Sequence, residues 1–421
     1  MDDFANMAWQ TFKTLVWPAA GRGEADTRRD ISDMVGSRVF ETYKADWETF
    51  REGAAEPLVW DRYPDKAPIC ANADTMTPPL DRDSLVLASL HKFGNLDQID
   101  FGSGGNRIFH ILVTQKGGLV RYLTGFNKQT FNTIRANKLY GPLAVGATDD
   151  QPVPPRLFEP SSLNKTGAIN IKTAWIEMDG ISDPGSFHTR WAWVQRPHHE
   201  VAQRACDLKL VGLVALHIAH KTESSPQWIW ASFEHVRNVP ESANLTERTD
   251  YTFNDGLGTT RMDDDPPTEA RFPLKKPFKV PDPYNVERRR EIPKEIRDIN
   301  ASWQGLLKHT VWSNYKLVTV QWPKTKLSPA ATGADVSKPG KSTAIPLPPC
   351  GEFTSIDVSI ANSVIETFLQ LDTECGRNNT CMSCHNNARN YDFIWSIPTK
   401  DWEHSKAAIS LLRQAISGSR Q

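Results

Sequence analysis

Apolar residues recur at intervals of three and four near the start of the chain, which is the period of an amphipathic helix. Over residues 4–16 this pattern predicts a helix that ends before Pro18, because proline has no N–H to continue the helical hydrogen bonds. A second stripe, of aromatic residues, predicts another helix over residues 37–53, which ends at a glycine. We therefore expect an N-terminal helical region over residues 1–60.

The hydrophobic period changes to two from about residue 105, and this alternation is typical of half-buried strands. A first pair of strands is predicted around Gly117 and Gly118, which form a hairpin signal. Residues 238–293 carry clusters of proline, aspartate and lysine, and we expect them to run over the surface. We assign residues 80–325 to a central β-rich domain. Within it, the patterns predict strands in residues 167–178, 186–195, 208–222, 226–236 and 315–323, and helices in residues 127–141 and 291–307.

The composition changes after the β-rich domain. Residues 326–344 include the stretch SPAATGADVSKPGKST, whose small and turn-forming residues predict a linker or loop. Residues 345–421 show mainly the helical period. The predicted fold class is therefore α+β and mainly β: a central antiparallel β sandwich or barrel with N-terminal helices and a helical C-terminal segment.

The charge balance narrows the choice of partner. The 421 residues include 49 basic and 50 acidic side chains, so the formal net charge is -1 and no nucleic-acid partner is expected. No apolar run is long enough to span a bilayer, so we expect no transmembrane segment. The start MDDFANMAWQ lacks the charged and apolar regions of a signal peptide, and the sequence reads as a mature chain.

The stretch NNTCMSCHNNARN near the end of the chain carries the strongest chemical signal. Cys381 and Cys384 are separated by two residues, and His385 follows directly. Two thiols at this spacing can add to the two vinyl groups of a porphyrin, and the adjacent imidazole can bind the iron from one face. We therefore predict one covalent haem c in residues 345–421, with His385 as the proximal iron ligand.

Other interpretations of these cysteines are open but weaker. A zinc site would need Cys375 beside the three motif residues, yet the adjacent Cys384 and His385 point apart and seldom close one tetrahedron. A redox disulfide normally starts a helix after a strand in a thioredoxin-like unit, and that pattern is missing here. A plain disulfide between Cys381 and Cys384 would fit an exported binding or structural protein.

The ligand opposite His385 decides between electron transfer and catalysis, because a second strong ligand favours the former and an open iron permits the latter. Residues 386–421 contain no methionine, which excludes the downstream ligand of the commonest small electron carriers. The candidates are His404 in the C-terminal segment and His217 or His235 in the β-rich domain. We prefer His217 as a cofactor-binding residue, with His235 second, because a polar ring between two alanines of an apolar strand needs a partner.

A haem at this motif has consequences for the rest of the protein. Covalent attachment to CxxCH takes place outside the bacterial cytoplasm, so we expect a periplasmic or extracellular protein. We also expect the haem to lie where residues 345–421 meet the β-rich domain, because so short a segment buries too little core to enclose a porphyrin alone. The remaining cysteines are then free to form up to two disulfides: Cys70, Cys206, Cys350 and Cys375.

The order of several stretches along the chain resembles one family of proteins. The stretches are WQTFKTLVWPA, VFETYK, GAINIKTAWIEM, VGLVALHIAHKT followed by PQWIWASFEHVRNVP, VTVQWP, ANSVIETFLQ and TCMSCH. Together they resemble exported bacterial proteins of the cytochrome c family whose function is uncharacterised, over nearly the whole chain. The resemblance implies one covalent haem at Cys381 and Cys384 with His385 as ligand, and a periplasmic or extracellular location. It names no substrate.

The leading functional hypothesis is a redox protein that passes electrons through its haem to a partner protein or a small-molecule donor or acceptor. The first alternative is a haem-dependent enzyme of peroxidase or oxygenase type with its pocket in the β-rich domain. The second is the exported binding or structural protein in which the motif cysteines form a disulfide.

Overall fold

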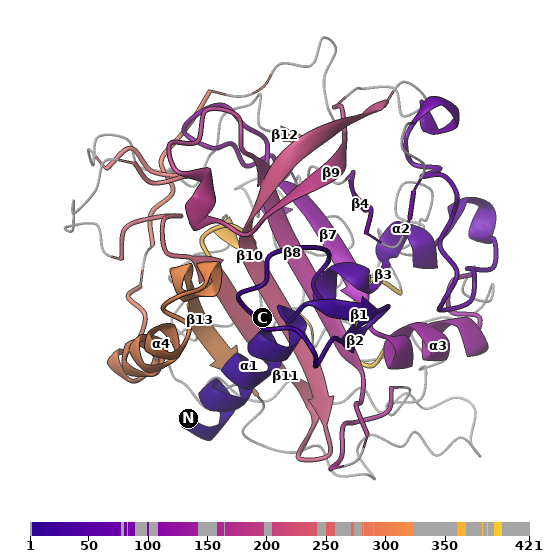
Figure 1. Ribbon diagram of the computed structural model, residues 1–421, viewed down its shortest axis with the longest axis horizontal. Helices are drawn as coiled ribbons and strands as arrows, with labels where there is room; N and C mark the ends of the chain where they lie inside the picture. The colour runs from indigo at the N-terminus through magenta and orange to yellow at the C-terminus, as the bar shows by residue number, and fades with distance from the viewer. Residues whose placement is uncertain are drawn as a thin grey trace, which may run out of the picture.

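A curled and mainly antiparallel β-sheet forms the centre of the computed structural model, with short helices around it (Figure 1). The prediction of a mainly β, α+β fold is therefore confirmed. No helix of the described part is long and apolar enough to cross a membrane. The structure describes residues 2–76, 80–81, 83–88, 99–100, 108–141, 158–163, 165–197, 204–241, 250–256, 271–272, 280, 282–288, 290–322, 360–367, 381, 385 and 391–397. The predicted linker at 326–344 and most of the predicted C-terminal helices fall outside these residues.

The central sheet has eight strands among the described residues, and six of them run side by side in the order β13, β11, β10, β8, β7, β3. Neighbours in this order are antiparallel, whereas β4 runs parallel to β9. Strand β10 is long because its first half pairs with β9 and its second half with β11. The strands are β3 (Lys44–Ala45), β4 (Leu85–Leu87), β7 (Arg121–Phe126), β8 (Ile169–Glu177), β9 (Thr189–Gln195), β10 (Cys206–Thr222), β11 (Ser225–His235) and β13 (Tyr315–Gln321).

Two smaller sheets and several short helices complete the described part. The predicted hairpin is confirmed, since Val113 pairs with Leu119 and Gly117 adopts φ 79°, a conformation that glycine takes without strain. The predicted strands over β8 to β11 and β13 and the helices α3 and α4 are also confirmed. The remaining elements are β1 (Ala19–Gly21), β2 (Glu24–Ala25), β5 (Ile99–Asp100), β6 (Ile108–His110), β12 (Arg271–Phe272), α3 (Lys128–Ala136), α4 (Lys294–Leu306) and 3-10 turns at Phe40–Thr42, Glu52–Ala54, Ala73–Thr75, Pro184–Ser186 and Val311–Asn314.

Helix α1 (Asp2–Leu15) confirms the first predicted helix and packs against one face of the sheet, in front of β11 in Figure 1. Its buried side chains Trp9 and Phe12 meet Phe233 of β11, with ring centroids 4.9 and 4.4 Å apart. Each fully buried aromatic ring of this kind contributes about 1.5–3 kcal/mol. The N-terminal helix is thus part of the same core as the strands, and α4 packs beside it.

The predicted second helix over residues 37–53 is wrong. This segment contains instead a 3-10 turn, β3 and the four-residue helix α2 (Asp46–Thr49). Lys44 pairs with Phe126 of β7, and its buried ammonium lies 3.2 Å from the carboxylate of Glu48. Pairing with the sheet outweighs the helical pattern because helix propensity is a weak preference that tertiary contacts override.

The predicted surface excursion over residues 238–293 is wrong for residues 251–256 and 284–286, whereas the described residues 280, 282 and 283 are exposed. Phe253, Tyr284 and Val286 are buried in the core beside β7, β8 and β10. The hydroxyl of Tyr284 donates a hydrogen bond to the carbonyl of Ile111 at 2.9 Å, which ties this piece to the hairpin. The sequence pattern did not indicate this burial, because clusters of proline and charged residues surround the few apolar residues that are buried.

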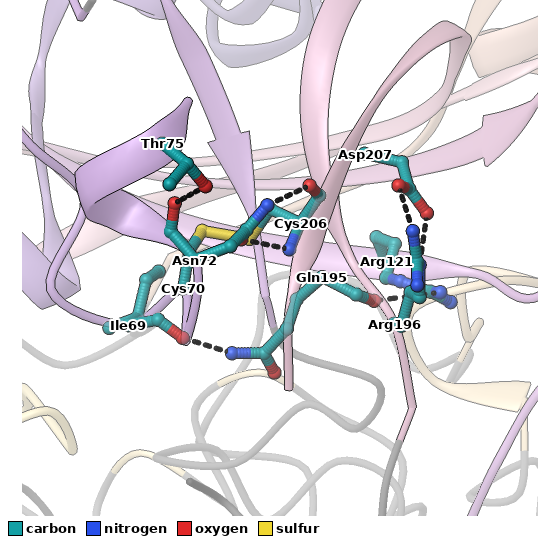
Figure 2. Close-up of a disulfide and its surroundings, with 9 residues drawn as sticks. All are labelled: Ile69, Cys70, Asn72, Thr75, Arg121, Gln195, Arg196, Cys206 and Asp207. Carbon is teal, nitrogen blue, oxygen red and sulfur yellow. Dashed lines mark hydrogen bonds and ion pairs between the residues drawn. A yellow bond between two sulfur atoms is a disulfide. The ribbon is translucent and has the colours of Figure 1, made fainter. Parts of the chain in front are cut away.

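A disulfide joins Cys70 to Cys206 at the start of β10, with Cα atoms 5.4 Å apart (Figure 2). Asn72 clamps the same point, because its side-chain amide both donates to the carbonyl of Cys206 and accepts from its N–H, at 3.0 and 2.8 Å. This is one of the pairings that the sequence allowed. The other two cysteines of that set, Cys350 and Cys375, fall outside the described residues.

Candidate functional site

The face of the sheet opposite α1 receives the C-terminal pieces of the chain. In Figure 1 these yellow pieces lie behind the strands, whereas α1 lies in front. Cross-strand register sets side chains of β13, β11, β10 and β8 next to one another on this face, because paired residues point to the same side. We call it the C-terminal face, and its two relevant rows are Gln321, Trp230, Ala219, Asn170 and Thr319, Ser232, His217, Lys172.

The two described residues of the CxxCH motif, Cys381 and His385, contact side chains of the first row. The side-chain oxygen of Gln321 accepts a hydrogen bond from the backbone N–H of Cys381 at 2.7 Å. One strand further along, the ring of His385 lies against the ring of Trp230, with centroids 3.9 Å apart. Cys384 falls outside the described residues. The motif is therefore anchored to the central sheet at both of its described ends.

The tautomer of His385 follows from one hydrogen bond. Its Nδ1 lies 2.7 Å from the carbonyl oxygen of Phe393. A carbonyl can only accept, so Nδ1 carries the hydrogen and donates it, which leaves the lone pair of the neutral ring on Nε2. Nε2 is then the nitrogen that can bind a metal, oriented by the hydrogen bond on the other side of the ring.

A buried ion pair holds the turn that supplies this carbonyl. The carboxylate of Asp392 contacts the ammonium of Lys221 from β10, and both side chains are almost fully inaccessible to solvent. The same carboxylate accepts the backbone N–H of Phe158 at 3.1 Å, and the backbone carbonyl of Asp392 accepts the indole N–H of Trp228 at 3.0 Å. Burial raises the pKa of Asp392 to about 6, although Lys221 acts in the opposite direction.

Backbone strain is concentrated around the same turn. Asp392, Phe393 and Trp228 adopt φ of 51°, 68° and 73°, which side-chain-bearing residues rarely do. Each such residue costs on the order of 1–3 kcal/mol and persists only where the surroundings impose it. Strain of this kind gathers at functional sites, which favours a specific role for the turn beside His385.

His217 lies in the second row of the C-terminal face, where the sequence predicted a pocket residue. Its Nε2 is 3.6 Å from a carboxylate oxygen of Glu366, and both side chains are partly accessible, at 17% and 14%. Residues 360–367 are fixed to the sheet by Asn362, whose amide donates to the hydroxyl of Ser232 at 2.9 Å. His217 thus shares a face with the motif and stands beside a carboxylate.

His235 has a different placement, and the expectation that it lies near the motif needs correction. It faces the α1 side of the sheet, fully buried, with its ring 3.9 Å from that of Phe187. Its Nε2 donates to the carbonyl of Ser186 at 2.9 Å, and its Nδ1 accepts the N–H of Arg237 at 3.2 Å. The physical reason is strand alternation: an even separation from Phe233 sends His235 to the face that α1 covers.

The burial of His235 should make the protein sensitive to acid. Burial lowers the pKa of this histidine to about 3, whereas an unfolded histidine has a pKa near 6.5. Between these values the unfolded chain binds a proton that the folded chain does not, so stability should fall as the pH falls through this window. His235→Asn should reduce the slope of unfolding free energy against pH by up to about 1.4 kcal/mol per pH unit, measured by urea unfolding from pH 4 to 7. His309→Asn, at an exposed position, is the matched control for the substitution itself.

The residues on the C-terminal face fit a haem in a second respect besides the tautomer of His385. Four buried polar atoms on this face have no hydrogen-bond partner among the described residues: both polar atoms of the Asn170 side chain, the hydroxyl of Thr319 and the Nε2 of Gln321. Buried polar groups nearly always have a partner, so these atoms suit a face that receives polar groups such as haem propionates. Asn170 is two strands from Trp230, about 10 Å at the strand spacing of a sheet.

Sequence reasoning missed the anchors of the motif. No motif marks Gln321, Lys221 or Asp392, and the available signal was the polar character of Lys221 and Gln321 in apolar strands. His404, the competing candidate for the sixth ligand, falls outside the described residues. In the described part, no three His, Cys, Asp or Glu side chains are grouped so that they could hold a metal ion together.

A comparison of the chain with protein-family models, with curated proteins and with solved structures finds no match. The interpretation of the site therefore depends on the chemistry of the motif and on the geometry given above.

Proposed function

We propose that this protein is a c-type monohaem redox protein that transfers electrons between its haem and a partner protein or a small molecule. The thiols of Cys381 and Cys384 would hold the haem covalently, and His385 would bind the iron through Nε2. A haem in this place supplies one-electron redox chemistry. The observation that carries the proposal is the hydrogen bond from His385 Nδ1 to the carbonyl of Phe393, because it prepares Nε2 for iron.

Two further features support the proposal. The Cys70–Cys206 disulfide suits an exported protein, since disulfides persist in oxidising compartments and haem c is attached there. Aromatic rings also form a path from the motif into the core. The ring of Trp230 lies against that of His385, and the ring centroids of Trp228 and Trp230 are 6.3 Å apart. In this proposal the sheet orients the motif and shields one side of the haem from water.

A haem enzyme is the second candidate, and the pair of His217 and Glu366 favours it. An imidazole beside a carboxylate can move a proton to or from a bound small molecule, as peroxide chemistry requires. If His217 instead binds the iron as a sixth ligand, the haem is closed and electron transfer is favoured.

The state of the iron separates the two candidates. Protein matured in a periplasmic expression system should keep one haem through denaturing electrophoresis. A six-coordinate, low-spin spectrum that carbon monoxide and cyanide leave unchanged would support electron transfer, whereas rapid ligand binding and peroxide-dependent turnover would support the enzyme.

His217→Ala should change the haem spectrum or the reduction potential, because this residue shares the C-terminal face with the motif. The matched variant His404→Ala should leave both unchanged. The opposite result would assign the sixth position to His404, and no effect from either variant would mean that no histidine stands opposite His385.

A further inference from the structure

We infer that the buried Lys221–Asp392 ion pair is the positioning device of His385: it holds the 391–397 turn in its strained conformation and so delivers the carbonyl of Phe393 to the imidazole. Lys221 and Asp392 then act through His385 and do not touch the iron. The inference deepens the proposed function and rests on it.

Burying this ion pair costs desolvation free energy. Lys221 is 1% and Asp392 0% exposed, so both charges have lost their hydration. A buried ion pair is rarely more stabilising than two apolar side chains of the same size, so its presence is weak evidence for a role in stability. What the ion pair does provide is a fixed orientation of Asp392. Its carboxylate contacts both Lys221 and the backbone N–H of Phe158, and these two contacts allow few positions of the turn.

The orientation of Asp392 matters because the next residue, Phe393, supplies the carbonyl that accepts the hydrogen bond from His385. Asp392 and Phe393 both have positive φ, at 51° and 68°. Two successive residues in this region turn the chain sharply and cost on the order of 1–3 kcal/mol each. The indole of Trp228 reinforces the turn by donating to the carbonyl of Asp392. Without the ion pair, the turn would relax towards negative φ and carry the carbonyl of Phe393 away from Nδ1 of His385.

The strength of the hydrogen bond at Nδ1 controls how strongly the His385 imidazole donates electrons to the iron. A strong acceptor at Nδ1 makes the imidazole a better electron donor through Nε2, which stabilises the oxidised iron more than the reduced iron. A weaker bond should therefore favour the reduced state. Neighbours of metal-bound histidines of this kind typically change metal affinity or activity by 10- to 100-fold.

The test measures the reduction potential of haem-loaded variants. In Lys221→Met the ratio of reduced to oxidised iron at a fixed ambient potential should rise about tenfold, which is about 59 mV for a one-electron couple. Lys221→Arg keeps the charge and should stay within about twofold of the unchanged protein. The double variant Lys221→Met/Asp392→Asn removes both charges, and asparagine tolerates positive φ. It should regain most of the stability lost in Lys221→Met but keep the shifted ratio.

Each outcome decides the inference. A merely structural ion pair predicts that the double variant restores the ratio together with the stability, and that result would overturn the inference. So would an unchanged ratio in haem-loaded Lys221→Met, or, if that variant does not fold, in the double variant. The control is Glu48→Gln, which breaks another buried ion network, to Arg22 at 3.1 Å and Lys44 at 3.2 Å. An equal shift there would mean general loosening and would reject the inference. If the unchanged protein carries no haem, the proposed function fails with it.

Discussion

Protein in which Cys381 and Cys384 are both replaced by alanine should carry no covalent haem. After maturation in a periplasmic system, the unchanged chain should retain a haem stain through denaturing electrophoresis, and the double variant should lose it completely, because thioether bonds to these two sulfurs are the proposed attachment. Cys381→Ala or Cys384→Ala alone should keep a weaker stain through the remaining bond. The pyridine complex of either single variant should absorb at longer wavelength, since one vinyl group stays conjugated.

The control for this experiment is Cys350→Ala, which removes a cysteine outside the motif and should leave the stain at its full intensity. Two results would contradict the proposal. One is a stain that survives in the double variant, which would place the attachment elsewhere. The other is stoichiometric zinc without haem in the unchanged protein.

Removal of the Cys70–Cys206 disulfide should cost the protein about 5 kcal/mol of unfolding free energy at 25 °C, from the loop-closure entropy of a sequence separation of 136. The bond restricts the unfolded chain and joins the 67–76 loop to the start of β10 (Figure 2). Cys70→Ala/Cys206→Ala is the appropriate variant, because both cysteines are buried and alanine leaves no unpaired polar group. Guanidinium unfolding curves of the two proteins give the difference.

Reductant supplies the control for the disulfide. It should lower the unfolding midpoint of the unchanged protein by more than it lowers that of the double variant. A difference of less than about 1 kcal/mol between the proteins would show that the unfolded chain is already compact enough for the bond to matter little.

Much of the local structure follows from the sequence. The apolar period of 3.6 located α1 and α4, and the alternation over β8, β10 and β11 located the central strands. Strand alternation also separated His217 from His220 correctly, since side chains at odd spacing point to opposite faces. His220 meets Ser161 and α1 on the far side, with hydrogen-bonding atoms 2.6 Å apart at Ser161.

The errors have one cause. Over residues 37–53 a helical stripe is present, yet Lys44 and Ala45 pair with β7. The local sequence does not show that β7 offers an unpaired edge to this segment. His235 was ranked beside His217 because both are polar residues of apolar strands. The face that each one occupies relative to the motif depends on which strands lie side by side, and strand order is a property of long-range pairing.

The sequence by itself determined the chemistry that this protein can carry: two thiols and an imidazole at the spacing of a haem attachment, a mainly β chain, and cysteines free to pair. Only the tertiary structure decided how that chemistry is held. Lys221 and Asp392 are 171 positions apart, and Trp230 meets His385 across a similar distance in the chain. Contacts of this range arise from strand register and from the packing of the C-terminal pieces on one face of the sheet. The periodicity of a segment records which of its faces is apolar, but it holds no information about which distant segment will cover that face.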